Sequence, residues 1–554
     1  MALPSYQMPK DRMALLSDPQ DASFLYVAGN GGHIAYRVRG WQGDAPVWEK
    51  LWGSKGNHTK DGSAPHCDCR NWAWRPPPSS PSSSSSSSPP SSSSPSPSSA
   101  QGTIVLVSDG GIFERDLPRA PLAQGGWRSL NGNIGAMEFL TAHWDAADAR
   151  WVGGAQDNDV QLAPLACTPD DAALGINFGD GTVTAVDNSQ TPARIFGTTQ
   201  FYGQRDLDRV TGGRSDAGMG RGHAGRRRLD GDGDDDDDGS DDAPGFINSG
   251  LLFRQGPLTL AVPLEKWFPI SAQFPLFVQP FQLNAAAPTQ LVIFANGSAG
   301  GAANASGWYG VELPPGLSDP DDVAEPTLLA ETEARASVLD FRVGGVTGGA
   351  ADPAVLVGVN STHFYHRASP AAVTDAVVIR ALPTTFTEPS ILAYTAAGDP
   401  LIGPVSHGQT VFLAVHPGDS STSAVTGWSS VRDNAAGADS VWLTTDAGDT
   451  WMDATGDLAA ATATVGRARP SGLLLLGDAL LVGTVAGVFV SHPVAGSPVK
   501  WSRLGLCSDL PLVLVMGLSH EAGSDTLVAA TMGRGIYVLA NATQALAQHR
   551  KSQR

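Results

Sequence analysis

Short runs of β-branched and aromatic residues recur along the whole chain, and glycine or aspartate marks the turns between them. Such runs are typical of β-strands, because these side chains fit a pleated and half-buried surface. Many runs are followed, after a turn that contains glycine, by a second run of the same kind, which predicts antiparallel hairpins. First runs lie at residues 24–29, 103–108, 354–359, 411–415, 479–484 and 526–531, and second runs at 111–115, 487–491 and 535–539.

Hairpins that recur over roughly 500 residues predict an all-β fold built from repeats. Only residues 542–549 show apolar positions at helical spacing. A tryptophan followed three residues later by leucine occurs at Trp48, Trp127 and Trp501, and a large ring at a fixed place in each repeat suits packing between the blades of a propeller. The sequence therefore predicts a single β-propeller of about seven or eight four-stranded blades over residues 1–548, with a basic tail at 549–554.

Two segments interrupt this pattern. Residues 76–99 are serine and proline only, and residues from about 205 to 244 hold an arginine cluster followed by nine aspartates between positions 230 and 242. Neither composition can bury enough apolar surface to offset the entropy of ordering the chain. We therefore expect disordered insertions at 76–100 and at about 205–244.

Composition and charge narrow the classes of partner. Charged residues make up only 16% of the chain and the net charge is −19, or −10 without the nine aspartates of the acidic run. A mildly acidic protein of this kind is not expected to bind nucleic acid. No apolar stretch reaches the length of about 18 residues that a membrane-spanning helix needs. We expect a monomer without a membrane span that binds a glycan or protein ligand.

Three features of the sequence bear on the cellular compartment of the protein. Five glycosylation sequons suit a secreted glycoprotein, and the serine–proline run resembles the hydroxyproline-rich stretches of algal extracellular matrix glycoproteins. The N-terminal residues do not show the basic-then-apolar pattern of a signal peptide. We expect the secretory pathway, and a chloroplast or cytoplasmic location is the alternative. The sequons are at Asn57, Asn296, Asn304, Asn360 and Asn541.

The sharpest motif contains Thr444, Asp446, Gly448, Thr450 and Trp451. It resembles the Asp-box, or BNR repeat, of sialidase-like β-propellers, S/T-x-D-x-G-x-T-W. The aspartate can accept hydrogen bonds from the N–H groups of a tight turn, the glycine can adopt a positive φ, and the tryptophan can lie between neighbouring sheets. The resemblance implies a structural role for these five residues and not a catalytic one.

A second group of motifs resembles the sortilin-like and bacterial BNR-repeat branch of these propellers. The motifs are H-x-D-x-R at 66–70, D-G-G-I at 109–112, G-G-x-Q-D-N at 153–158, G-D-G at 179–181 and G-R-G at 533–535. Consecutive blades are neighbours, so equivalent turns would lie on one face of the propeller. The resemblance predicts a binding site there, formed by His66, Asp68, Arg70, Asp109, Gln156, Asp157, Asn158 and Asp180.

Several functions fit these residues. The same residues can also be turn formers whose side chains bond their own backbone. A non-catalytic module that binds glycan or protein is the main hypothesis. A glycoside hydrolase acting on a polysaccharide is the alternative if the protein is an enzyme, because two of these carboxylates could act as the acid and the base. A scaffold of the photosystem-assembly type is a further alternative. We expect no cofactor and no metal site, since the cysteine spacing does not match a zinc site.

Overall fold

The computed structural model describes residues 13–29, 35–43, 45–52, 69–77, 102–108, 111–121, 125–130, 137–156, 160–164, 174–175, 181–199, 251–256, 258–261, 280–296, 306–314, 316–317, 319, 322–332, 338–360, 362–367, 377–383, 393–394, 400–401, 411–427, 439–465, 468–506 and 509–553. Strands dominate these residues, and the predicted all-β class is confirmed. The described residues hold two helices, α3 (Leu458–Thr462) and α4 (Ala542–Ser552), and neither is long and apolar enough to cross a membrane.

Contacts divide the chain into two compact units, Met1–Met137 and Glu138–Arg554. The sequence predicted one propeller over residues 1–548, whereas the first two sheets form a unit of their own. Most of the residues expected in the two insertions, from 78 to 100 and from about 205 to 244, lie outside the described part of the chain.

The first unit contains two four-stranded antiparallel sheets, each with its strands in chain order. Its core surrounds Trp127, whose indole N–H donates to the carbonyl oxygen of Leu51 at 2.8 Å. The bond joins the two sheets, because Leu51 belongs to one and Trp127 to the other. The strands are β1 (Met13–Ser17), β2 (Phe24–Gly29), β3 (Ala35–Arg39), β4 (Val47–Trp52), β5 (Cys69–Arg75), β6 (Thr103–Ser108), β7 (Gly111–Arg115) and β8 (Trp127–Ser129).

The second unit contains six four-stranded sheets and one three-stranded sheet, all antiparallel, and a small two-stranded sheet. The first three sheets are β9 (Phe139–Asp145), β10 (Arg150–Ala155), β11 (Val160–Pro164) and β12 (Leu174–Gly175); β13 (Gly181–Asp187), β14 (Arg194–Thr199), β15 (Leu251–Gln255) and β16 (Leu258–Ala261); and β17 (Phe281–Asn284), β18 (Ala287–Asn296), β19 (Ser306–Glu312) and β20 (Thr327–Thr332).

The remaining sheets follow the same antiparallel pattern. They are β21 (Asp340–Thr347), β22 (Ala350–Val359), β23 (His363–Arg367) and β24 (Val378–Ala381); the pair β25 (Ala393–Tyr394) and β26 (Pro400–Leu401); β27 (Val411–His416), β28 (Asp419–Gly427), β29 (Val441–Thr444) and β30 (Met452–Asp453); β31 (Ser471–Leu476), β32 (Ala479–Thr484), β33 (Gly487–Ser491) and β34 (Ser502–Arg503); and β35 (Val515–Glu521), β36 (Thr526–Thr531) and β37 (Ile536–Leu539).

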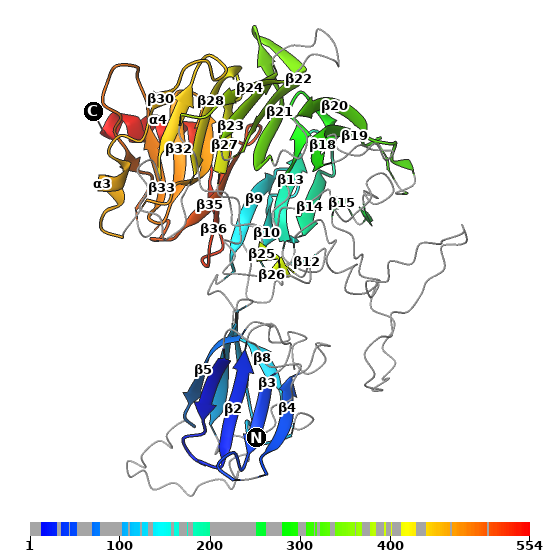
Figure 1. Ribbon diagram of the computed structural model, residues 1–554, viewed down its shortest axis with the longest axis vertical. Coiled ribbons are helices and arrows are strands. Elements are labelled where there is room, and N and C mark those ends of the chain that lie inside the picture. The colour runs from blue at the N-terminus through cyan, green and yellow to red at the C-terminus, as the bar shows by residue number, and fades with distance from the viewer. Residues whose placement is uncertain are drawn as a thin grey trace, which may run out of the picture. The chain divides into compact units, whose positions relative to one another are not determined.

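The seven larger sheets of the second unit form a closed ring. The first strand of each sheet contacts the first strand of the next, and β35 of the last sheet contacts β9 of the first. Figure 1 shows β35 and β36, in dark red, beside β9, in cyan. The Ser519 hydroxyl in β35 donates to the carbonyl oxygen of Ala142 in β9 at 2.7 Å. Radial sheets whose first strands surround an axis are the architecture of a β-propeller.

Two glycines of the G-G-x-Q-D-N motif, both in β10, allow the first sheet of the ring to approach the second sheet on one side and the last sheet on the other. A Cβ atom on Gly154 would lie 2.0 Å from the carbonyl oxygen of Thr182 in β13. A Cβ atom on Gly153 would lie 2.7 Å from the Ile536 side chain in β37. The motif therefore serves packing on both sides of β10, which is a structural use of residues that also suggested a binding turn.

The chain ends in a helix instead of a loose tail. Residues 542–549 were the one segment with helical spacing, and α4 continues through the residues assigned to a basic tail as far as Ser552. His549, Arg550 and Lys551 lie in its last turn, where positive charge interacts favourably with the helix dipole. Among the described strands, the last strand of the chain, β37, pairs with β36 alone.

Candidate functional site

Most of the predicted binding residues lie outside the described part of the chain: His66, Asp68, Asp109, Asp157, Asn158 and Asp180. Arg70 lies in β5 of the first unit. Gln156 follows β10 of the second unit, is buried, and donates its backbone N–H to the carbonyl oxygen of Glu138 at 2.8 Å. The convergence of these eight residues on one face therefore stays a prediction.

The turn between β29 and β30 is held by side chains of the Thr444–Trp451 motif. One carboxylate oxygen of Asp446 accepts the Thr450 backbone N–H at 2.8 Å, and the other accepts the Thr450 hydroxyl at 2.6 Å. The Thr444 hydroxyl accepts the Gly448 backbone N–H at 2.9 Å and donates to Asp446 at 2.8 Å. Hydrogen bonds from Thr450 and Thr444 hold the pKa of Asp446 below its ordinary value. These bonds occupy the carboxylate within its own turn.

The same turn also packs against the preceding sheet. The Trp451 ring meets the Phe364 ring of β23 edge-on, with 5.2 Å between centroids. Gly448 has a φ of +87°, and a Cβ atom there would lie 2.7 Å from Phe364. Arg380 of β24 forms an ion pair with Asp449 at 2.7 Å. The motif thus contributes to the junction between two blades.

The first strands of all seven sheets line one cavity of about 240 Å³ at the centre of the ring. Its wall combines apolar and polar side chains. Strands from all seven sheets of the ring converge on this cavity, so we treat it as the candidate site. The polar side chains in its lining are Thr141, His143, Thr184, Gln282, Asp340, Arg342, Ser519 and His520.

His143 lies on β9 and contributes an imidazole to the cavity. Its Nδ1 atom lies 3.1 Å from the hydroxyl oxygen of Thr184 on β13. Burial within the ring lowers the pKa of His143 to about 4, and the positive charge of Arg342 acts in the same direction. The imidazole is therefore neutral at neutral pH, and one ring nitrogen is already hydrogen bonded to a neighbouring blade.

Asp340 and Arg342 of β21 bind each other and the neighbouring strand. Arg342 donates to one carboxylate oxygen of Asp340, and the other oxygen accepts the backbone N–H of Leu413 at 2.9 Å. A second guanidinium nitrogen of Arg342 donates to the carbonyl oxygen of Leu413 at 2.9 Å. The pair therefore holds both polar groups of one peptide residue in β27, which fixes the junction of two blades.

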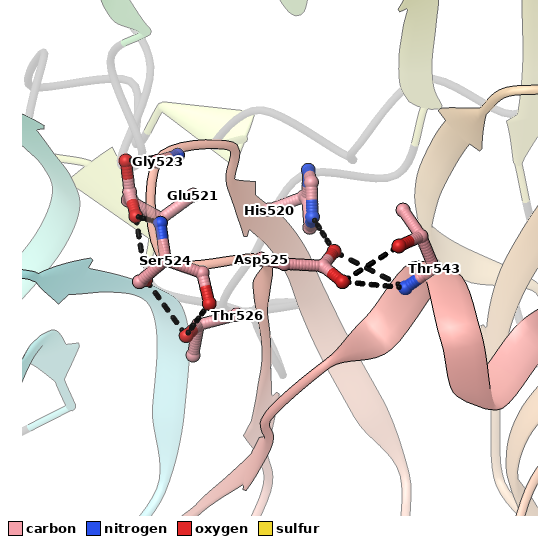
Figure 2. Close-up of polar contacts among 7 residues, drawn as sticks. All are labelled: His520, Glu521, Gly523, Ser524, Asp525, Thr526 and Thr543. Carbon is pink, nitrogen blue, oxygen red and sulfur yellow. Dashed lines mark hydrogen bonds and ion pairs between the residues drawn. The ribbon is translucent and has the colours of Figure 1, made fainter.

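His520 of β35 belongs to a further polar network (Figure 2). Its Nε2 atom lies 2.9 Å from one carboxylate oxygen of Asp525, and the other oxygen accepts the Thr543 hydroxyl at 2.6 Å. Burial raises the pKa of Asp525, but the hydrogen bonds from Thr543 and His520 outweigh it and leave the pKa below its ordinary value. In the same turn, Glu521 accepts the Ser524 hydroxyl at 2.5 Å.

Asp340 is the one carboxylate among the described residues that line the cavity, and both its oxygens already accept hydrogen bonds. The described residues contain no group of three histidine, cysteine, aspartate or glutamate side chains arranged to hold a metal ion. None of the sequence motifs pointed to His143, Arg342 or His520 as site residues. A polar residue within an otherwise apolar strand could have indicated them, as Arg342 does between Phe341 and Val343.

Comparisons with known proteins leave the family open. No protein-family model matches the chain, and no curated protein is significantly similar to it in sequence. Among solved structures, that of U3-55K is similar with a TM-score of 0.36 and 8% sequence identity, over 71% of this chain and 88% of that chain. The propeller architecture therefore rests on the ring of sheets itself, and the resemblance to Asp-box and sialidase-like propellers has no support from these comparisons.

Proposed function

We propose that this protein is a non-catalytic binding module whose ring of sheets presents a surface to a protein or glycan ligand. The central cavity supplies the observation that carries the proposal. Several of its described polar side chains bond one another or neighbouring backbone, as Asp340 does with Arg342 and Leu413. Asp340 positions two blades through these bonds, and the described lining holds no second carboxylate to form an acid and base pair with it.

The main alternative is a glycoside hydrolase, which needs two carboxyl groups on either side of the scissile bond. The described lining of the cavity offers one carboxylate. A binding module instead needs stable blades and an accessible surface, and side-chain to main-chain hydrogen bonds join further blades, as Ser471 of β31 does with the carbonyl oxygen of Val515 in β35 at 2.6 Å. The binding hypothesis is therefore favoured over hydrolysis.

The test measures binding and turnover on the same preparation of the full chain. Labelled protein is applied to a glycan array and to an array of extended peptides, and release of reducing ends is followed with a panel of polysaccharides. We expect reproducible binding to one class of ligand without turnover. Release of reducing ends that disappears in Asp68→Asn or Asp157→Asn would overturn the proposal in favour of the hydrolase.

Two variants also test where the ligand binds. If the predicted turns form the site, Asp68→Asn and Asp157→Asn lose binding and keep the melting temperature of the native protein. Asp449→Asn is a matched control, because Asp449 is exposed and its carboxylate pairs with Arg380 at a blade junction. Unchanged binding in both test variants would exclude these turns as the site and leave the binding hypothesis intact.

A further inference from the structure

Among the described residues, the last sheet of the ring has no strand on the outer side of β37. The other six sheets of the ring each have four strands, whereas this one consists of β35, β36 and β37. All four residues of β37 are half-buried and apolar, with the sequence Ile-Tyr-Val-Leu. Exposed edge strands are normally protected by charge, proline or a covering element, because their free N–H and C=O groups can pair with another chain. Neither charge nor proline occurs within β37.

The alternation of hydrogen bonds between β36 and β37 shows which main-chain groups of β37 face outward. The Thr531 backbone N–H donates to the carbonyl oxygen of Gly535 at 3.1 Å, and the register continues through Ala529 opposite Tyr537. In antiparallel pairs, bonded and non-bonded residues alternate. Ile536 and Val538 therefore direct their N–H and C=O groups away from β36, toward the open edge.

An apolar groove of about 520 Å³ lies beside this edge. Its walls come from β33 and the segment after β34, from the strands β36 and β37, and from α4. An extended peptide added to β37 would place alternate side chains in such a groove, which is the geometry of β-strand addition. The apolar lining consists mainly of Val488, Leu504, Leu510, Leu527, Tyr537 and Leu539.

The charges around the groove indicate the chemistry of the occupant. Arg534 is exposed and lies two residues before β37. Lys551 is exposed in the last turn of α4, and His549 and Ser552 of the same helix end line the groove. Asp509 is the one acidic side chain in the lining, and it accepts the Leu506 backbone N–H at 2.9 Å. These basic residues, beside β37 and at the end of α4, favour acidic residues in the partner.

We propose that β37 and this groove bind an extended segment of a partner protein, with alternating apolar residues flanked by acidic ones, which adds as the fourth strand of the last sheet. The inference rests on the proposed binding function and gives its ligand class as peptide. In the antiparallel order of the other sheets, the C-terminal acidic residues of the segment meet Arg534.

A second copy of this chain is a poorer occupant. Antiparallel pairing of two β37 strands would bring Arg534 of one copy toward the Leu539 end of the other, the end from which the chain continues into α4. Ala540 and Asn541, which follow Leu539, carry no charge, so a second copy would offer Arg534 no acidic partner in the added strand. An acidic segment of a different protein supplies that partner.

The experiment uses the full chain and a fluorescein-labelled peptide in which valine and threonine alternate between a pair of aspartates at each end. Binding is measured by fluorescence anisotropy at low and high salt. We expect affinity that weakens with salt, and no binding of the same peptide with lysine pairs at its ends. Val538→Pro removes one outward N–H and should weaken binding roughly tenfold, whereas Val538→Thr keeps that N–H and should bind as the native protein does.

A charge reversal avoids any change to the main chain. Arg534→Glu should weaken binding of the aspartate-flanked peptide, and Arg39→Glu, at an exposed arginine of the first unit, should not. Equal binding of both peptides, absence of binding, or an unchanged affinity in Val538→Pro and Arg534→Glu would overturn the inference. A dimer of the native chain that Val538→Pro dissociates would also overturn it, in favour of a second copy. If these variants still bind ligands on the glycan or peptide array, the proposed binding function holds but this groove is not its site.

Discussion

The carboxylate of Asp525, in the turn between β35 and β36, accepts both the backbone N–H and the hydroxyl group of Thr543 in the first turn of α4. The residue preceding the helix, Asn541, has a φ of +53° and makes no capping bond with its side chain. The cap of α4 is therefore supplied by a residue distant in sequence, which attaches the helix to the last sheet.

Replacing this distant cap should loosen α4. Asp525→Ala removes the acceptor for the Thr543 groups, and we expect a loss of about 1 kcal/mol in the free energy of unfolding, as for other helix caps. Asp525→Asn retains an acceptor oxygen and should remain close to the native protein. Urea unfolding monitored by circular dichroism measures both, and equal stability of the alanine variant would show that the cap contributes nothing.

The turn between β29 and β30 should depend on Asp446. Asp446→Ala leaves the Thr450 N–H and hydroxyl without their acceptor, so the melting temperature should fall while ligand binding is retained. Asp449→Ala, three positions away, removes a surface ion pair with Arg380 and should change the melting temperature less. Differential scanning calorimetry of the two variants gives the comparison, and lost binding at an unchanged melting temperature would reverse the structural assignment.

His143 should make stability depend on pH. Its pKa is lowered from 6.5 to about 4 by burial and by Arg342, so between these values the unfolded chain binds a proton that the folded ring does not. The stability due to the neutral imidazole is fully present above pH 6.5 and decreases as the pH falls toward 4. Melting temperatures across this range should fall less steeply for His143→Gln than for the native protein, and parallel curves would contradict the assignment.

The Asp340 carboxylate should stabilise the junction between β21 and β27. In Asp340→Ala the buried N–H of Leu413 loses its acceptor and Arg342 loses its partner, which should cost about 1–3 kcal/mol in the free energy of unfolding. Asp340→Asn preserves one acceptor and should cost less. Guanidinium unfolding is a suitable measurement, and a smaller loss in the alanine variant than in the asparagine variant would argue against this role.

The positions of the strands could be predicted from the sequence because the residues with high local strand propensity are also the residues that pair in the sheets. The runs at 103–108 and 526–531 are strands at those residues, and both carry the alternating or wholly buried side chains that a sheet in a packed unit requires. Likewise, the helical spacing at 542–549 lies within α4. These features depend on residues close in sequence, and sequence therefore suffices for them.

The closure of the ring and the central cavity could not be predicted from the sequence in the same way. Ser519 and Ala142 lie on neighbouring strands where the ring closes, although 377 positions separate them, and no rule of sequence spacing connects such residues. His143 and Arg342 each occupy one place in a strand, and identifying them required knowing which strand of each sheet lies innermost. The predicted turn residues could not be placed together because most fall outside the described part of the chain.

The ring has a seam. Neighbouring sheets elsewhere are joined by the continuous polypeptide. Among the described residues, the first and last sheets are linked through side chains and one main-chain bridge, between Glu138 and Met532, and they share no strand. A force applied between the two ends of the second unit should therefore separate β35 from β9 before it breaks the hydrogen bonds within any sheet. Single-molecule extension of this unit should then begin with a small opening event, and a disulfide engineered across the junction should abolish it.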